Sequence, residues 1–110
     1  MKKHSLISGE QGSGKTTLAN LMTMNLQTEV YEFKKFKEPV SAGVQAIIFE
    51  GIETEEDLAA FFKMAETDGI SFRPVFKRIQ ITVRPVYIGV TQMPPAPGEE
   101  LPCNHFKLQK

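Results

Sequence analysis

The first residues that could do chemistry form a glycine-rich segment near the start of the chain. Residues 9–16 read GEQGSGKT, so three glycines are followed directly by Lys15 and Thr16. Glycines permit backbone angles and close approaches that a Cβ would prevent, which lets the loop's N–H groups converge on an anion. The lysine can reach the terminal phosphates of such an anion, and the threonine hydroxyl can coordinate Mg²⁺. The segment therefore predicts a polyphosphate-binding site.

The patterns on either side of this segment predict a strand before it and a helix after it. Residues 3–8 (KHSLIS) form a short apolar run that ends at a glycine, as a buried strand does. Apolar residues then recur at positions 18, 21, 22 and 26, which is helical spacing and predicts an amphipathic helix over residues 15–27. The positive end of that helix would point at the bound anion.

The segment matches G-x-x-x-x-G-K-[ST] in full, and it resembles the Walker A motif of P-loop NTPases. This resemblance implies a parallel sheet in which the phosphate loop joins the first strand to the first helix. It also implies that ATP or GTP binds there with Mg²⁺ and that Thr16 is the magnesium ligand. The nucleotide-binding residues would be Gly9, Glu10, Gln11, Gly12, Ser13, Gly14, Lys15, Thr16 and Thr17.

A second buried strand is predicted over residues 45–50 (QAIIFE), and it ends in the carboxylate of Glu50. If this strand lies beside the first one, Glu50 shares a sheet edge with Thr16. The strand resembles the Walker B strand of AAA-type ATPases, with Phe49 at the usual Asp position. Glu50 would then activate water and act on Mg²⁺ only through water. It also resembles small-molecule kinases similar to uridine kinase, whose strand ends in Glu-Gly, and a merely solvated acid is the third interpretation.

The second half of the chain begins with a helix and continues as β structure. Thr54 can cap the helix, and acidic residues at positions 55–57 suit its positive end. Residues 71–83 and 85–91 then read as strands, with loop composition after Met93 and a last strand over residues 104–109. The whole pattern predicts one α/β domain over residues 1–110, with a parallel sheet flanked by helices. The family resemblances imply that this is a small P-loop NTPase-like sheet with a β-hairpin insertion.

This second half resembles the cores of superfamily-three helicases and phage primase-helicases, in which a basic hairpin precedes a strand that ends in a polar sensor residue. The resemblance makes Thr91-Gln92 the sensor, with Gln92 joining Lys15 and Glu50 as catalytic residues. An amide at this position could orient the attacking water or read the γ-phosphate. An ordinary junction between a strand and a loop is the alternative.

Four basic residues lie on or beside the predicted hairpin, and two interpretations of them remain open. On a hairpin they could contact a DNA backbone, which would add salt-dependent affinity. Charges on edge strands also keep β structure from pairing with neighbouring molecules, without any ligand. The residues are Arg73, Lys77, Arg78 and Arg84.

Composition limits the classes of function. The 110 residues carry 13 Lys+Arg and 13 Asp+Glu, so bulk charge does not favour nucleic acid, although a local patch can. Cys103 is the only cysteine, which excludes an internal disulfide, and neither His4 nor His105 has partners at metal-ligand spacing. The apolar runs are far shorter than the roughly 20 residues that a membrane helix needs. We expect a cytoplasmic protein with no membrane partner.

Three functional hypotheses follow. The first is a minimal ATPase or helicase-like core that binds ATP and Mg²⁺ and hydrolyses the nucleotide weakly. Hydrolysis is expected to be weak because no arginine follows Arg84, and an arginine finger is worth about 10³–10⁵ in rate. The second is a small-molecule, nucleoside-type kinase. The third is a non-catalytic nucleotide- or DNA-binding module of a mobile-element or phage assembly, acting as a homo-oligomer or within a larger complex.

Overall fold

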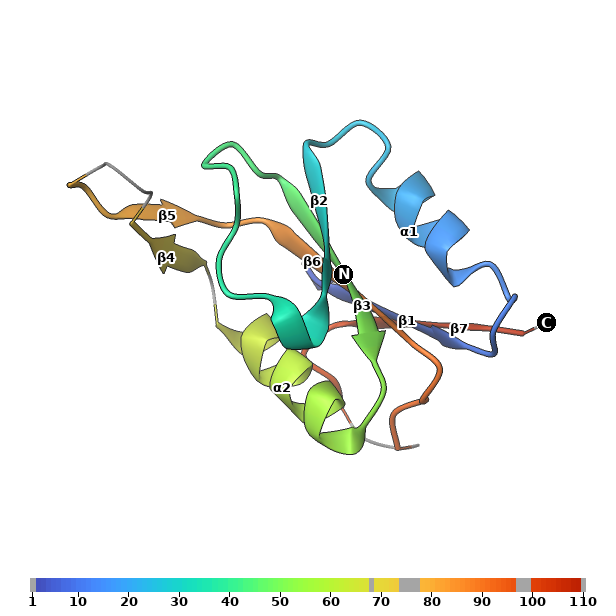
Figure 1. The fold of residues 1–110 in the computed structure, drawn as a ribbon. Coiled ribbons are helices and arrows are strands. Elements are labelled where there is room, and N and C mark those ends of the chain that lie inside the picture. The colour runs from blue at the N-terminus through green and yellow to red at the C-terminus, as the bar shows by residue number, and fades with distance from the viewer. Residues whose placement is uncertain (1, 68, 74–77, 97–99, 110) are drawn as a thin grey trace.

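The chain forms a five-stranded sheet in which every pairing is parallel (Figure 1). The computed structural model describes residues 2–67, 69–73, 78–96 and 100–109. The strands lie side by side in the order β2-β3-β6-β1-β7. Their bounds are Ser5–Gly9 for β1, Thr28–Glu32 for β2, Ala46–Ile52 for β3, Val86–Thr91 for β6 and Asn104–Leu108 for β7.

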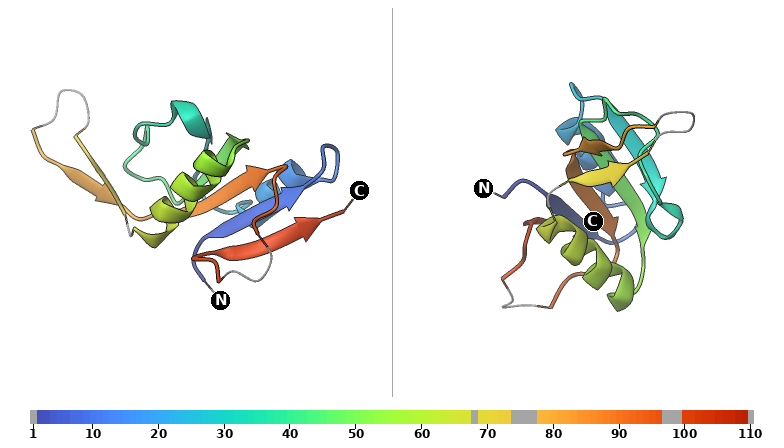
Figure 2. Two further views of the ribbon diagram at one scale, coloured as in Figure 1. Left: turned by 90° about the horizontal axis from the view of Figure 1, so that it is seen from below. Right: turned by 90° about the vertical axis from the view of Figure 1, so that its left-hand side faces the viewer.

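One helix covers each face of the sheet, so the domain has three layers (Figure 2). Successive strand residues point to opposite faces. Ile48 and Ile88 pack with Ala19 of α1 (Lys15–Met22), whereas their neighbours Phe49 and Tyr87 lie in the core beneath α2 (Glu55–Glu66). A short 3-10 turn, η1 (Phe33–Lys35), closes the α2 side beside β2. The α/β class predicted from the sequence is confirmed.

The predicted start of α2 is confirmed in detail. Thr54 accepts a hydrogen bond from the Asp57 N–H at 3.1 Å, and the Asp57 carboxylate accepts one from the Thr54 N–H at 3.3 Å. This reciprocal pair is a capping box, which satisfies N–H groups that have no partner within the helix. Desolvation raises the pKa of Asp57, but hydrogen bonds from Glu53 and Thr54 and the charge of Lys34 outweigh it, so the pKa is lowered.

The predicted extent of α1 is wrong, because the helix ends at Met22 and does not reach residue 27. The Thr23 hydroxyl donates to the Ala19 carbonyl at 3.0 Å, and the Leu26 N–H closes a turn on the Thr23 carbonyl at 3.0 Å. Such local bonds compete with continued helix formation. The predicted amphipathic pattern is confirmed in part, since Leu18 and Met22 pack against the core together with buried Ala19, whereas Leu21 is 60% exposed.

Glu50's strand does not lie directly beside the first strand, although both belong to the same run of neighbouring strands. Strand β6 lies between them and pairs with both β1 and β3. After β3 the chain forms α2 and a hairpin, and it then returns as β6 to the position between β1 and β3. Adjacent strands are about 4.8 Å apart, so β1 and β3 are separated by about 10 Å. The end of β6 therefore lies between the end of β1, which leads into the glycine-rich loop, and the end of β3, which carries Glu50.

The predicted hairpin insertion is present as β4 (Ile70–Phe72) and β5 (Ile81–Val83), which pair antiparallel. It projects away from the five-stranded sheet (Figures 1 and 2). Phe72 and Val83 at its base are buried in the core beneath α2. No helix in the described ranges is long and apolar enough to cross a membrane.

Candidate phosphate site at the carboxyl edge of the sheet

The glycine-rich loop between β1 and α1 turns sharply at two glycines. Gly12 (φ 82°) and Gly14 (φ 93°) both have left-handed backbone conformations, which side chains other than glycine rarely adopt. Gly14 is the N-cap of α1, and its carbonyl accepts the first helical hydrogen bond from Leu18 at 2.9 Å. A cavity of about 470 Å³ lies against the loop and is lined by Gln11, Gly12, Gly14, Lys15, Thr16, Thr17 and Gln92.

The Lys15 side chain folds back over its own loop. Its ammonium donates hydrogen bonds to the carbonyl oxygens of Gly9 and Glu10, both at 2.7 Å. These two carbonyls therefore hold the ammonium at the mouth of the loop. The loop cavity is not filled by this contact, and the lysine lines both it and the neighbouring cavity.

Gly9 is required by close packing and not by its φ angle of 159°, which is extended backbone. A Cβ there would lie 2.7 Å from both the Leu108 carbonyl oxygen and the Ser13 hydroxyl. That Ser13 Oγ is buried and has no hydrogen-bond partner among the described residues. A buried hydroxyl left unpaired costs about 1–3 kcal/mol, so the loop holds a polar atom that a further partner would satisfy.

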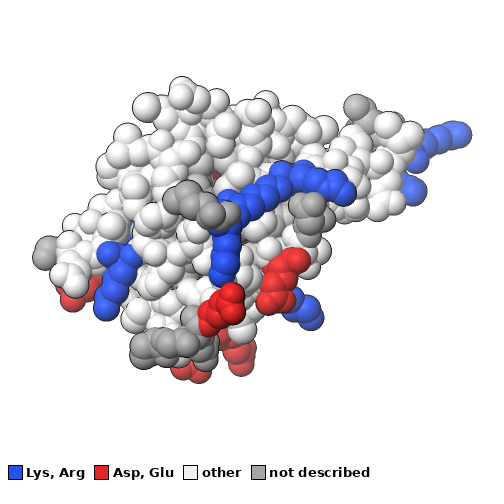
Figure 3. Space-filling model, turned by 180° about the vertical axis from the view of Figure 1, so that it is seen from behind, with Lys and Arg blue, Asp and Glu red and all other residues white. Residues whose placement is uncertain are grey.

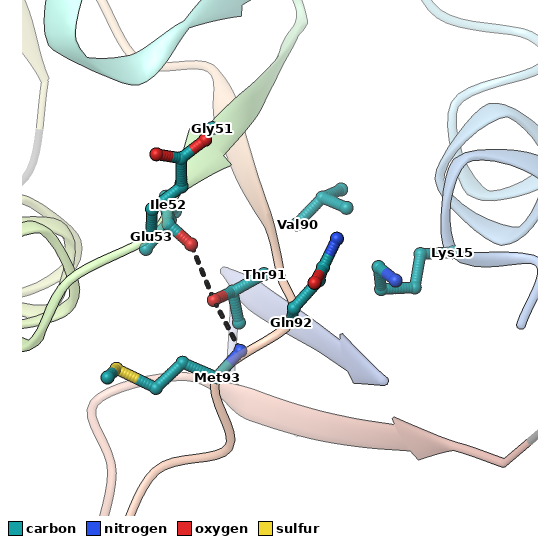
Figure 4. A pocket seen from close by; sticks show the side chains of 8 residues that line it. All are labelled: Lys15, Gly51, Ile52, Glu53, Val90, Thr91, Gln92 and Met93. Atoms are coloured by element: carbon teal, nitrogen blue, oxygen red, sulfur yellow. Dashed lines mark hydrogen bonds between the residues drawn. The ribbon is translucent and has the colours of Figure 1, made fainter. Parts of the chain in front are cut away.

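Gln92 lines cavities both at the glycine-rich loop and at the end of β3. A second cavity, of about 410 Å³, is lined by Lys15, Gly51, Ile52, Glu53, Val90, Thr91, Gln92 and Met93. In Figure 4 the Gln92 side chain extends from the end of β6 toward Lys15. Thr91, by contrast, is 2% exposed, and its hydroxyl donates to the Ile52 carbonyl at 2.7 Å. Both predicted sensor residues line this cavity, but only Gln92 also lines the cavity at the glycine-rich loop.

Glu50 lies on the same side of the sheet as α1, because it is two residues from Ile48 in β3. It pairs in register with Glu32 of the edge strand β2 and does not line either cavity at Lys15. The carboxylate that does is Glu53, which the sequence analysis did not single out. Glu53 is largely exposed, and its carboxylate lies 3.9 Å from the Lys34 ammonium.

A third cavity, of about 530 Å³, lies on the other side of the loop, between the ends of β1 and β7. Its lining is Ser8, Gly9, Glu10, Gln92, Pro94, Lys107, Leu108 and Gln109. Next to it the Ser8 hydroxyl and His105 Nε2 are 2.7 Å apart. Desolvation, followed by the charge of Lys107, lowers the pKa of His105. All three cavities share Gln92.

The basic residues of the hairpin are exposed where they can be described. Arg73 and Arg78 are exposed, and basic side chains project at the outer end of the hairpin in Figure 3. Arg84 lies where β5 joins β6, and its carbonyl accepts a hydrogen bond from the Lys3 ammonium at 3.0 Å. Lys77, the fourth predicted contact, lies outside the described residues.

The other chemically reactive residues do not gather into a site. In the part of the chain that the structure describes, no three His, Cys, Asp or Glu side chains are grouped as ligands for a metal ion. Cys103 is buried, and desolvation raises the pKa of its thiol to about 11 although the charge of Lys2 lowers it. No known protein family matches this chain, and no curated protein matches it either.

Proposed function

We propose that this chain binds a nucleoside triphosphate, ATP or GTP, at the loop formed by residues 9–17. The observation that supports this most strongly is the left-handed backbone at Gly12 and Gly14, directly before the first turn of α1. Successive turns of this kind direct backbone N–H groups into one concavity, and the helix N-terminus adds partial positive charge. The adjoining cavity of about 470 Å³ is large enough for a polyphosphate chain.

Lys15 supplies the charge in this proposal. Its ammonium now donates to two carbonyl oxygens, and phosphate oxygens would replace these acceptors with stronger, charge-assisted ones. Thr16 lines the loop cavity and offers its hydroxyl to a Mg²⁺ that accompanies the phosphates. Mg²⁺ usually keeps several waters, so one hydroxyl and the phosphate oxygens are an adequate ligand set. When bound, the ion would offset charge on the phosphates.

Gln92 is the residue that we assign to the terminal phosphate, because its side chain reaches toward Lys15 from the adjacent strand. Glu50 lies two strands from the loop on the α1 face, and Glu53 lines the cavity beside Gln92. Either carboxylate would act on water and not on the phosphates directly. We expect slow hydrolysis by the isolated chain, because no arginine follows Arg84 to stabilise the transition state.

Isothermal titration with ATP, GTP and ADP, each with and without Mg²⁺, tests the proposal. Lys15→Ala should abolish binding, since it removes the ammonium at the loop. Lys63→Ala, which removes an exposed lysine from α2, is the matched control and should bind as the unaltered chain does. Inorganic tripolyphosphate should bind at the same site and compete with ATP. If neither tripolyphosphate nor any nucleotide binds, the proposal is wrong.

A second function, DNA binding by the β4–β5 hairpin, is favoured by the way the hairpin projects with Arg73 and Arg78 exposed. Contacts from such residues to phosphates would weaken steeply as salt is raised. Fluorescence anisotropy with a labelled single strand at two salt concentrations tests this, with Arg73→Gln/Arg78→Gln as the variant. Gel filtration with nucleotide and DNA would reveal an oligomer or a larger assembly. Binding that survives the double substitution would exclude the hairpin as the DNA contact.

A further inference from the structure

The hydroxyl of Thr91 bridges the ends of two adjacent strands. It donates to the Ile52 carbonyl at 2.7 Å and accepts from the Met93 N–H at 3.0 Å (Figure 4). The first partner is the last residue of β3, and the second follows Gln92 in the turn that leaves β6. Thr91 is 2% exposed, so water does not compete for these bonds. Gln92 is flanked in the chain by Thr91, whose hydroxyl makes both bonds, and by Met93, whose N–H donates one of them.

An irregularity in β3 explains why a side-chain hydrogen bond links the end of this strand to β6. Phe49 pairs with Gly89 and Ile52 with Thr91, so β3 uses one more residue than β6 over this stretch. The extra residue is accommodated where Gly51 has a φ of 76°. A bulge of this kind interrupts the regular ladder and is often found beside functional sites. The Thr91 hydroxyl bonds the Ile52 carbonyl just where regular pairing is interrupted.

We propose that Thr91 is a positioning residue that holds the Gln92 amide beside Lys15, so that Gln92 can distinguish a triphosphate from a diphosphate. This inference rests on the proposed nucleotide site. Thr91 itself does not contact the nucleotide. Because its hydroxyl fixes the backbone on both sides of Gln92, the amide is held over the loop before the ligand arrives. Preorganised groups lose less freedom on binding than mobile ones do.

The test compares affinities for Mg²⁺ complexes of ADP and of a non-hydrolysable ATP analogue. A correctly held hydrogen bond to the charged γ-phosphate should favour the analogue about tenfold or more. Thr91→Val keeps the shape of the side chain but removes the hydroxyl, so this preference should be lost while ADP affinity is retained. Thr91→Ser should restore the preference. Thr82→Val, which removes a hydroxyl paired with Ser71 in the hairpin, is the matched control and should change nothing.

Amide hydrogen exchange supplies a readout that does not need nucleotide. The Met93 N–H should be protected in the unaltered chain and in Thr91→Ser, and should exchange at least about tenfold faster in Thr91→Val. If Thr91→Val does not fold, Thr91→Ala replaces it in both measurements. The inference is overturned if Thr91→Val keeps the triphosphate preference, if it weakens ADP and the analogue equally, or if the serine variant fails to rescue. If the unaltered chain binds nucleotide through Lys15 but does not prefer the triphosphate, this inference alone is overturned. If it binds neither nucleotide, the proposed function is overturned as well.

Discussion

Gly89, in the middle of β6, offers a sharp test of how the sheet packs against α2. A Cβ at this position would lie 2.9 Å from Phe61 Cζ and 3.0 Å from Ile52 Cδ1. Real Cβ atoms essentially never approach other heavy atoms within 3.0 Å, so Gly89→Ala requires a neighbour to move. Phe61 is fully buried and makes edge contacts with the rings of Phe33 and Phe49, which leaves it little room.

The cost follows from two opposing effects. Overpacking a well-packed core destabilises by about 1–3 kcal/mol. Replacing a strand glycine by alanine recovers about 0.5–1 kcal/mol, because the unfolded chain loses freedom. The net loss in the free energy of unfolding is therefore between about 0 and 2.5 kcal/mol, with a central value near 1 kcal/mol. For a chain of this length the central value corresponds to a fall in Tm of roughly 4 °C.

Urea denaturation followed by circular dichroism measures this loss, and a double-mutant cycle with Phe61→Leu identifies its cause. The smaller leucine removes the ring atoms that the new methyl group meets and leaves the contact with Ile52. Gly89→Ala should therefore cost less in the Phe61→Leu background than in the unaltered chain. An alanine variant more stable than the unaltered chain, or an equal penalty in both backgrounds, would refute the packing explanation.

Three further predictions concern single residues. Thr54→Ala removes the hydroxyl that caps α2 and should lower the free energy of unfolding by about 0.5–2 kcal/mol in urea, whereas Thr54→Ser should restore most of it. Native Cys103, buried and with a pKa of about 11, should react far more slowly with a disulfide reagent at pH 8 than the urea-unfolded chain; equal rates would contradict its burial. His105 has a folded-state pKa below its ordinary value of 6.5, so the unfolded chain binds more protons and stability should fall as the pH drops below about 6.5 toward the folded-state pKa. Urea titrations at pH 7.5 and 5 should show less of this loss in His105→Gln, and an identical loss in both chains would exclude His105 as its source.

Some features of the protein depend on interactions within a few residues, and the sequence predicted them well. Thr54 was predicted to cap α2, and its partner Asp57 is only three positions further along the chain. Gly12 and Gly14 have left-handed backbone conformations that other residues rarely adopt, and this preference does not depend on the rest of the fold. Strand positions followed from short apolar runs, whereas the hairpin was expected from a family resemblance.

Other features depend on segments that are far apart in the chain, and only the tertiary structure decided them. Local patterns do not encode which parallel strands pair, so the insertion of β6 between β1 and β3 could not be read from either strand. That insertion brings Gln92 near Lys15, 77 positions away by their numbers, and Glu53 lines the same cavity. The early end of α1 and the close approach of Phe61 to Gly89 likewise reflect what each element packs against. The conformation of the glycine-rich loop was thus determined by local backbone chemistry, whereas the surroundings of that loop were determined by the order of the strands.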